Sequence, residues 1–457
     1  MKKYNLFFRL ALILVLLFPA VSGSEKLQPD MLLTGVSSSQ LSVTLISPEY
    51  LSLAQYGEER IESLNRLMKH ISLETGIDGS GAAAVFCIDQ EPLFSVYESV
   101  EENNIRTCYS FIPDIALENS LDEEKTGGYS TLHDLETHFF RINRLLDSFY
   151  SVFGKCPGAF PELVRNESVS LNFRKIGKAV RRITIRFSAD YVRDSFPGAL
   201  SALTDSEEER KFIEQCVFEG SQRIMLLYDK DNKLIRISYD GTAGLSPEML
   251  RRISVNWKCL RDDQHKIDDL TLKTPAVKGY DKYNLVYARE LDQSDPEHQV
   301  MVWDYELDLR ENDIRQKIQY KSEILYEQGS LTGTMTFAQK QDGKEEKTTL
   351  APSLKKENEG EYKGSLEITD YSGKIIYSRV RTGLIISSGR DITAPDKDAA
   401  RVISLESSAR KEAEEEIQDR LASVLVSRLI TLPAEDLDFF SRDIPEGIWN
   451  SIIQSLY

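Results

Sequence analysis

The stretch QVMVWDYELDL, residues 299–309, alternates apolar and acidic side chains along most of its length. Successive side chains of a β-strand point to opposite faces of a sheet, so this segment predicts a strand with one apolar and one charged face. The same alternation recurs in residues 314–326 and again in residues 331–337. Consecutive strands of this kind, joined by polar turns, predict an antiparallel sheet.

Strand-like runs continue on both sides of this stretch and define a β-rich domain over residues 166–390. An apolar sheet face must be covered, either by curling, by pairing with a second sheet or by packing helices against it. Residues 396–430 supply a candidate helix, because apolar side chains recur there in a narrow stripe at helical spacing, before Pro433. We therefore expect the C-terminal residues 391–457 to pack on the sheet as helices.

The residues before this domain predict a smaller unit that mixes helices and strands. Helical spacing of apolar residues indicates a helix at 58–73 and another at 131–153. Short strand-like runs lie between the two helices, at residues 82–88, 93–97 and 106–112. The expected fold class is therefore α+β: a large, mostly antiparallel β-sheet packed by a long C-terminal helix, with a smaller helix and meander N-terminal unit over residues 24–165.

The first 23 residues predict a secretory signal peptide. Lys2 and Lys3 give a positive start, an apolar run covers Leu10–Phe18, and small residues lead to a cleavage position after Gly23. The run is about half of the roughly 20 apolar residues that a membrane-spanning helix needs, and no later stretch approaches that length. We expect a bacterial protein that is secreted or held in the cell envelope, with a mature chain that does not span the membrane.

The chain is acidic, with 73 Asp and Glu against 56 Lys and Arg and a formal net charge of −17. Removal of a basic signal peptide would make the mature chain more negative still. A polyanion repels phosphate backbones, so the charge argues against nucleic acid as a partner. Solubility outside the cell explains the charge most simply, and binding of a cation or a basic partner is the alternative.

The five cysteines permit at most two disulfides in an exported protein. Cys87 and Cys108 lie on neighbouring strand-like runs and are the candidate pair. No Cys-x-x-Cys occurs in the sequence, so neither a thiol-redox motif nor a zinc ribbon is expected.

No motif in the sequence carries a recognisable reaction. His133 and His138 are five residues apart, which would place their rings on diverging faces of a helix rather than around one metal ion. The acidic cluster at residues 262–269 lacks the spacing and the glycine of a calcium-binding loop. We therefore expect no metal and no cofactor, and we favour a non-catalytic protein over an enzyme.

The leading hypothesis is a non-catalytic envelope or extracellular protein that binds a ligand or partner, either an apolar ligand or another envelope protein. The candidate contacts are Trp303, Tyr305 and Tyr320, whose alternative role is to form the core of the sheet. Two other functions stay open. One is a hydrolase that cleaves wall polysaccharide through two carboxylates. The other is a structural or assembly factor that acts through the acidic helix around residues 412–416.

Overall fold

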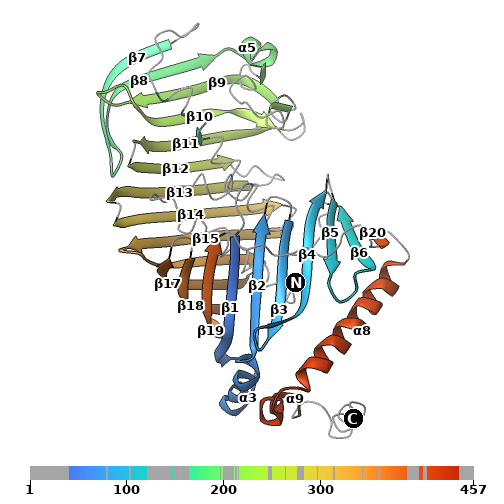
Figure 1. Ribbon diagram of the computed structural model, residues 1–457. Coiled ribbons are helices and arrows are strands. Elements are labelled where there is room, and N and C mark those ends of the chain that lie inside the picture. Colours follow the sequence, from blue (N-terminus) through green and yellow to red (C-terminus); the bar gives the residue numbers. More distant parts are fainter. Residues whose placement is uncertain are drawn as a thin grey trace. The chain divides into compact units, whose positions relative to one another are not determined.

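The computed structural model describes most of the chain between residues 41 and 441 (Figure 1). The predicted signal peptide lies outside the described residues, as does most of the helix predicted at 131–153. The described ranges are 41–78, 81–101, 104–120, 164–195, 197–198, 216–244, 250–262, 264–274, 282–295, 297–311, 314–341, 343–358, 361–388, 401–404 and 409–441, with single positions at 146, 147, 150, 154, 210, 211 and 214.

Within these ranges the chain is mostly sheet, with twenty strands assigned to one hydrogen-bonded sheet and few helices. The expected α+β class is therefore wrong. Residues 41–120, which were expected to form part of a separate N-terminal unit, contribute six strands to the sheet. None of the described helices is both long and apolar enough to cross a membrane.

The chain divides into two compact units, described separately below. Unit 1 comprises residues 1–136, 326–332 and 349–457, and unit 2 comprises residues 137–325 and 333–348. The domain boundaries predicted at 23, 165 and 390 stay predictions. Three strands contribute residues to both units: β15 (Ile314–Glu327), β16 (Ser330–Gln341) and β17 (Lys344–Asn358).

In unit 1, strands from the two ends of the chain pair with each other. Its strands are β1 (Leu41–Leu53), β2 (Ile71–Asp78), β3 (Gly81–Ile88), β4 (Glu91–Glu101), β5 (Asn104–Tyr109), β6 (Ile115–Ser120), β18 (Glu361–Ser372), β19 (Ile375–Ser388) and β20 (Arg401–Ser404). They pair in the order β18–β19–β1–β2–β3–β4–β5–β6–β20, antiparallel except for the parallel pair β6–β20.

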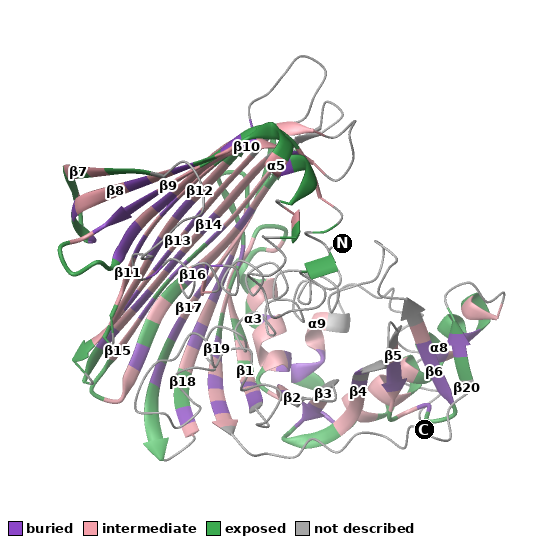
Figure 2. Cartoon of the chain, turned by 90° about the horizontal axis from the view of Figure 1, so that it is seen from above, coloured by how far each residue is buried: buried purple, intermediate pink, exposed green. Residues whose placement is uncertain are grey.

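This pairing joins N-terminal strands to strands from near the other end of the chain. Val43 and Leu45 alternate with polar residues and are buried where β1 lies between β2 and β19. Buried and less buried positions also alternate along β18 and β19 (Figure 2). Two strand neighbours satisfy the backbone hydrogen bonds of such a strand, and the alternation shows which of its faces is apolar.

The helices of unit 1 are shorter than the sequence predicts. The first is α3 (Glu58–Met68), which confirms the predicted start at residue 58. The second is α8 (Arg410–Leu429), whereas part of the segment predicted to begin that helix, Arg401–Ser404, forms strand β20. The described apolar contacts of α8 include a cluster with β6 and β20, in which Ile417 packs with Ile115 and Ile403. The expectation of one long helix covering the sheet is corrected accordingly.

A segment near the end of the described chain docks beside the C-terminal end of α3, where a histidine lies between two acidic side chains. The 3₁₀ turn η3 (Ala434–Asp436) places Asp436 2.9 Å from both His70 Nε2 and Lys69 Nζ, and His70 Nδ1 lies 2.6 Å from Asp89. Burial lowers the pKa of His70, but the hydrogen bonds and charges of Asp89 and Asp436 outweigh burial, so the pKa is raised above 6.5. Burial raises the pKa of Asp436, but the hydrogen bonds from Lys69 and His70 outweigh it, so that pKa is lowered.

Unit 2 contains a run of antiparallel strands in chain order. The strands are β7 (Val164–Phe173), β8 (Gly177–Phe187), β9 (Val217–Tyr228), β10 (Leu234–Gly244), β11 (Arg251–Arg261), β12 (His265–Thr274), β13 (Lys282–Asp295) and β14 (His298–Glu311). Each strand pairs with the next from β7 to β14. One side of this sheet carries a buried row of paired residues: Ile183, Leu226, Ile237, Trp257, Leu270, Tyr287 and Tyr305.

A buried ion-pair network lies beside this row. Asp268 and Arg289 are each 1% exposed, and Asp268 Oδ2 accepts hydrogen bonds from Arg289 Nε at 3.0 Å and Nη2 at 2.7 Å. The other oxygen, Oδ1, accepts from Arg261 Nη2 at 2.8 Å and from the indole of Trp257 at 3.0 Å. Arg261 also pairs with Asp147. The carboxylate therefore holds side chains from three neighbouring strands together.

Candidate functional site

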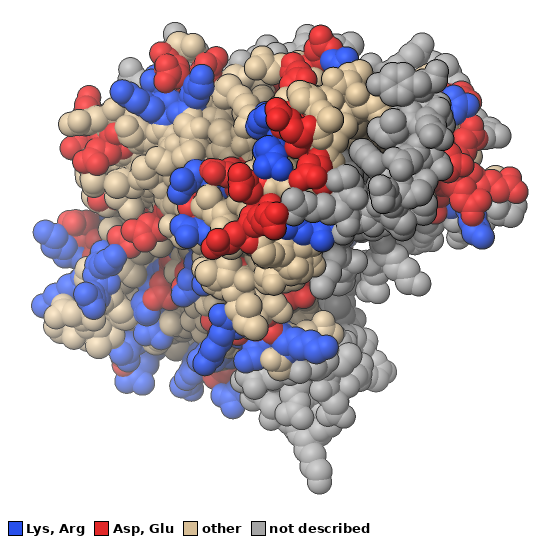
Figure 3. Space-filling view, turned by 90° about the horizontal axis from the view of Figure 1, so that it is seen from below, with Lys and Arg blue, Asp and Glu red and all other residues tan. Residues whose placement is uncertain are grey.

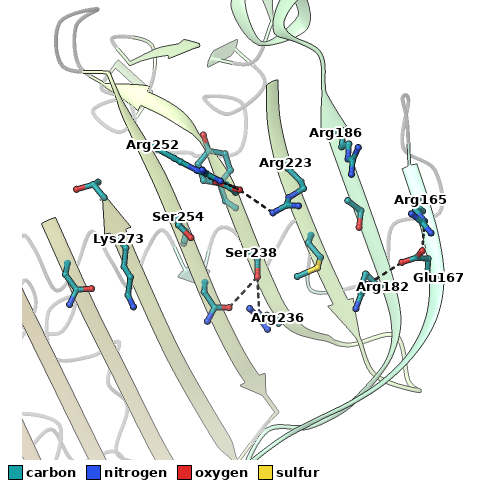
Figure 4. Close-up of a pocket in the computed structure, with 18 residues that line it drawn as sticks. Arg165, Glu167, Arg182, Arg186, Arg223, Arg236, Ser238, Arg252, Ser254 and Lys273 are labelled. Atoms are coloured by element: carbon teal, nitrogen blue, oxygen red, sulfur yellow. Dashed lines mark hydrogen bonds and ion pairs between the residues drawn. The ribbon is translucent and has the colours of Figure 1, made fainter. Parts of the chain in front are cut away.

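A hollow of about 1220 Å³ opens on the sheet of unit 2 (Figure 4). Its lining comes from seven consecutive strands, β7 to β13. The lining residues are Arg165, Glu167, Arg182, Thr184, Arg186, Arg223, Met225, Arg236, Ser238, Tyr239, Asp240, Arg252, Ser254, Val255, Asn256, Lys273, Thr274 and Asn284.

Strand register brings these residues together. Residues that face each other on adjacent antiparallel strands point to the same side of the sheet. One row of such partners crosses six strands and consists of Arg186, Arg223, Asp240, Ser254, Lys273 and Asn284. A second row beside it consists of Arg165, Thr184, Met225, Ser238 and Asn256.

The lining is basic, since seven of its residues are Arg or Lys and two are Asp or Glu. Figure 3 shows both signs of charge over one face of the molecule, so this excess of cations is a local feature. The two acids are both engaged by arginines. Glu167 pairs with Arg165 and Arg182.

The second acid, Asp240, lies between two arginines. Arg252 donates to both of its oxygens at 3.0 Å, and Arg223 Nη2 lies 3.3 Å from Oδ2. The hydrogen bonds from Arg252 lower the pKa of Asp240, and the nearby Arg223 charge adds to this effect. Asp240 therefore stays ionised at neutral pH and serves as an acceptor.

Two cations of the lining, Arg186 and Lys273, have no carboxylate partner among the described residues, and a third, Arg236, interacts electrostatically with Asp269. Arg186 is exposed and sits directly opposite Arg223 in the register, an arrangement of like charges that opposes strand pairing. Arg236 is half-buried, and its Nε donates to Ser238 Oγ at 3.0 Å. Figure 4 shows no interaction drawn from Arg186 or Lys273 to another lining residue.

Neutral hydrogen-bonding side chains alternate with the cations. Ser238 Oγ lies 3.4 Å from Asn256 Oδ1, so the second row joins a hydroxyl and an amide. Thr184, Ser254 and Asn284 add two hydroxyls and a further amide to the lining. Hydroxyls and amides can both donate and accept hydrogen bonds, unlike the arginines, which only donate.

The candidate contacts predicted from the sequence lie elsewhere. Trp303 and Tyr305 are on β14 and Tyr320 is on β15, and each of the three is buried. None of them lines the hollow. Their burial fits the alternative reading as core, and their contact with a ligand stays a prediction.

The predicted disulfide also stays a prediction. Cys87 on β3 is aligned with Pro92 of β4, and Cys108 on β5 is aligned with Tyr97 of β4. Strand β4 therefore lies between the two cysteines, whereas a disulfide requires Cα atoms within about 7 Å.

Sequence reasoning missed the hollow because it weighed the charge of the whole chain. A local signal was present, since Arg182, Thr184 and Arg186 alternate with the apolar Ile183 and Ile185. The part of the chain that the structure describes holds no group of three or more His, Cys, Asp or Glu side chains arranged to bind a metal ion.

No family model matches the chain, and no curated protein matches it either. Among solved structures it is similar to outer-membrane expressed OmpT of Vibrio cholerae, at 7% identity and a TM-score of 0.23, over 77% of this chain and 96% of that one. It is also similar to OpdQ of Pseudomonas aeruginosa, at 8% identity and a TM-score of 0.23, and to a mutant of the Rh. blastica porin, at 8% and 0.21. Both of these matches cover 77% of this chain and 98% of the other.

The mature chain was expected not to span the membrane, whereas outer-membrane proteins are among these matches. The sequence test looked for an unbroken apolar run of helical length, which alternating strands do not produce. Those outer-membrane proteins are cell-envelope proteins, and for this chain that location is a proposal. At these identities and TM-scores the likeness assigns neither a ligand nor an activity to this chain.

Proposed function

We propose that this chain is a non-catalytic protein of the cell envelope that binds an anionic ligand in the hollow of unit 2. The observation that carries the proposal is the excess of cations in one hollow of a chain with a net charge of −17, where Arg186 and Lys273 have no carboxylate partner among the described residues. Seventy-three acidic residues were available to neutralise them.

The arrangement of the cations supports a binding role. Two arginines on adjacent strands, Arg186 and Arg223, face the same hollow and repel each other. An anion between them would remove this repulsion and could accept paired hydrogen bonds from both guanidinium groups. The half-buried Arg236 contributes in the same way, because burial lowers its pKa and a bound anion would offset that cost.

The two alternative functions gain no support from the described residues. A hydrolase of this kind would need two carboxyl groups available to the substrate, and both acids of the hollow are ion-paired with arginines. An assembly factor acting through α8 would present free acids. Three of those acids pair with cations on their own helix: Glu414 with Arg410, Glu415 with Lys411, and Glu416 with Arg420.

Calorimetric titration of the purified full chain with inorganic pyrophosphate tests the proposal. We expect saturable binding that weakens as salt is raised, because the attraction between exposed charges is screened. Arg186→Gln should weaken binding about tenfold, the effect of losing one hydrogen bond to a charged group. Arg181→Gln is the matched control, since Arg181 lies on the same strand and is not part of the lining.

The comparison between these two arginine variants decides the outcome. Equal affinity of Arg186→Gln and Arg181→Gln for pyrophosphate would show that the hollow is not the anion site. An absence of binding to the unaltered chain at low salt would reject the proposal as a whole.

A further inference from the structure

We infer that the ligand of the hollow is an acidic oligosaccharide, a short chain of sugar rings carrying carboxylates. This inference rests on the proposed function and adds the ligand class to it. Three features of the hollow carry it: the positions of its cations, the neutral groups between them, and its extent across the strands.

The cations require acidic groups at separated points. Arg186 and Lys273 stand four strand intervals apart in the same row, with Arg223, Asp240 and Ser254 between them. Neighbouring strands are about 4.8 Å apart, so the two free cations are separated by about 19 Å along the row. A single compact anion cannot contact both, whereas a chain with acidic groups at intervals can.

The groups between the cations require a ligand that also donates hydrogen bonds. Asp240 lies in the middle of the row and only accepts, and one lone-pair position remains on its Oδ1 after the bonds from Arg252 and Arg223. Asn256 and Ser254, on the next strand, can accept as well as donate. Sugar hydroxyls supply donors to these groups. A polyphosphate chain supplies acceptors alone and would meet the charge of Asp240.

The size of the hollow favours several sugar rings over one. Its volume of about 1220 Å³ lies above the range of about 300–1,000 Å³ that is usual for small-molecule sites. The labelled side chains in Figure 4 are spread over successive strands rather than converging on one point. A ligand that crosses the strands can place acids at the cations and hydroxyls at the neutral side chains of the same rows.

Calorimetry with three probes on the full chain tests the ligand class. The probes are a tetramer of galacturonic acid, a neutral tetramer of glucose and inorganic tetraphosphate. We expect the acidic sugar to bind most tightly and the neutral sugar not to bind measurably.

Two asparagine variants separate sugar recognition from charge. Asn256→Ala should weaken binding of the acidic sugar about threefold to tenfold, the effect of losing one hydrogen bond, and weaken tetraphosphate binding less. Asn172→Ala, on the exposed part of β7 and away from the lining, is the control and should change neither affinity. Arg186→Gln should weaken binding of both anions.

The outcomes distinguish the ligand class from the binding function. If tetraphosphate binds as tightly as the acidic sugar, or if Asn256→Ala and Asn172→Ala behave alike toward the sugar, the ligand class is wrong and the anion-binding function stands. If neither anion binds, both the ligand class and the proposed anion-binding function are wrong.

Discussion

Substitution of Asp268 by Asn tests the buried network of unit 2. The change preserves the shape of the side chain but removes its charge, and it turns one acceptor into a donor facing the arginines. Arg289 is 1% exposed, so its charge would lose its nearest partner without gaining water. Removing one member of a buried ion pair costs about 3–5 kcal/mol. Because Asp147 also lies 3.9 Å from Arg289 Nη2, we expect the lower end, about 3 kcal/mol.

Urea unfolding followed by tryptophan fluorescence measures this loss, since Trp257 donates a hydrogen bond to Asp268. With a slope of about 2–3 kcal/mol/M, the unfolding midpoint should fall by roughly 1–1.5 M. The adjacent Asp269→Asn is the matched control. Its partner Lys258 lies 2.5 Å away, and the Asp269 side chain is 39% exposed, so its loss should cost less than about 1 kcal/mol.

Equal shifts of the two midpoints would refute the reasoning. A second comparison covers the case in which Asp268→Asn does not fold. The double variant Asp268→Leu with Arg289→Met removes both charges of the buried pair. It should be more stable than Asp268→Leu alone, because that single variant leaves the Arg289 charge buried without Asp268.

Three further predictions concern other parts of the chain. The pKa of His70 is raised above 6.5, so its charged form stabilises docking of η3 fully below pH 6.5, and this contribution is lost as pH rises through the folded-state pKa. Amide hydrogen exchange of residues 434–437 should therefore speed up between pH 6 and pH 8 by more than the intrinsic exchange rate does. His70→Gln should remove this additional increase in rate. If the additional increase is unchanged in the variant, the role of His70 is contradicted. Ile417→Ala should lower the free energy of unfolding by about 2–4 kcal/mol, because it opens a cavity among the residues that α8 packs against. Faster proteolysis within α8 would show this loss, whereas Gln418→Ala, at an exposed position, should have little effect. Gly333→Ala would place a Cβ 2.5 Å from the carbonyl oxygen of Glu323, so its thermal midpoint should fall by an amount equivalent to about 1–3 kcal/mol, while the exposed Thr334→Ala should leave it nearly unchanged.

Many strands of the sheet could be predicted from the local alternation of apolar and polar residues. The stretch at 299–309 forms β14 (His298–Glu311), and Met301 and Trp303 are buried on it as their period-two spacing predicts. Pairings between distant segments were not readable, because alternation shows which side of a strand is apolar and not which strand lies beside it. The pairing of β1 with β19 is the clearest case, because the alternation within either segment does not point to the other.

The hollow could not be predicted from the sequence for a related reason. Its residues run from Arg165 to Asn284 and belong to seven strands, so no window of sequence contains the site. Register converts that scattered set into two rows. The net charge of −17 pointed away from an anionic ligand, because a total charge carries no information about where the cations gather.

The place of β1 between β2 and β19 also sets an order of events. Ser42 Oγ lies 2.8 Å from Ser387 Oγ, a hydrogen bond between residues 345 positions apart. A chain that emerges N-terminus first must keep one edge of β1 unpaired until β19 has been made, and unpaired edges are the places where chains aggregate. Contacts of such long sequence separation also slow folding. Any protein that accompanies the chain during synthesis must therefore protect the unpaired edge of β1 until the last strands have been made. The strand order itself creates this requirement.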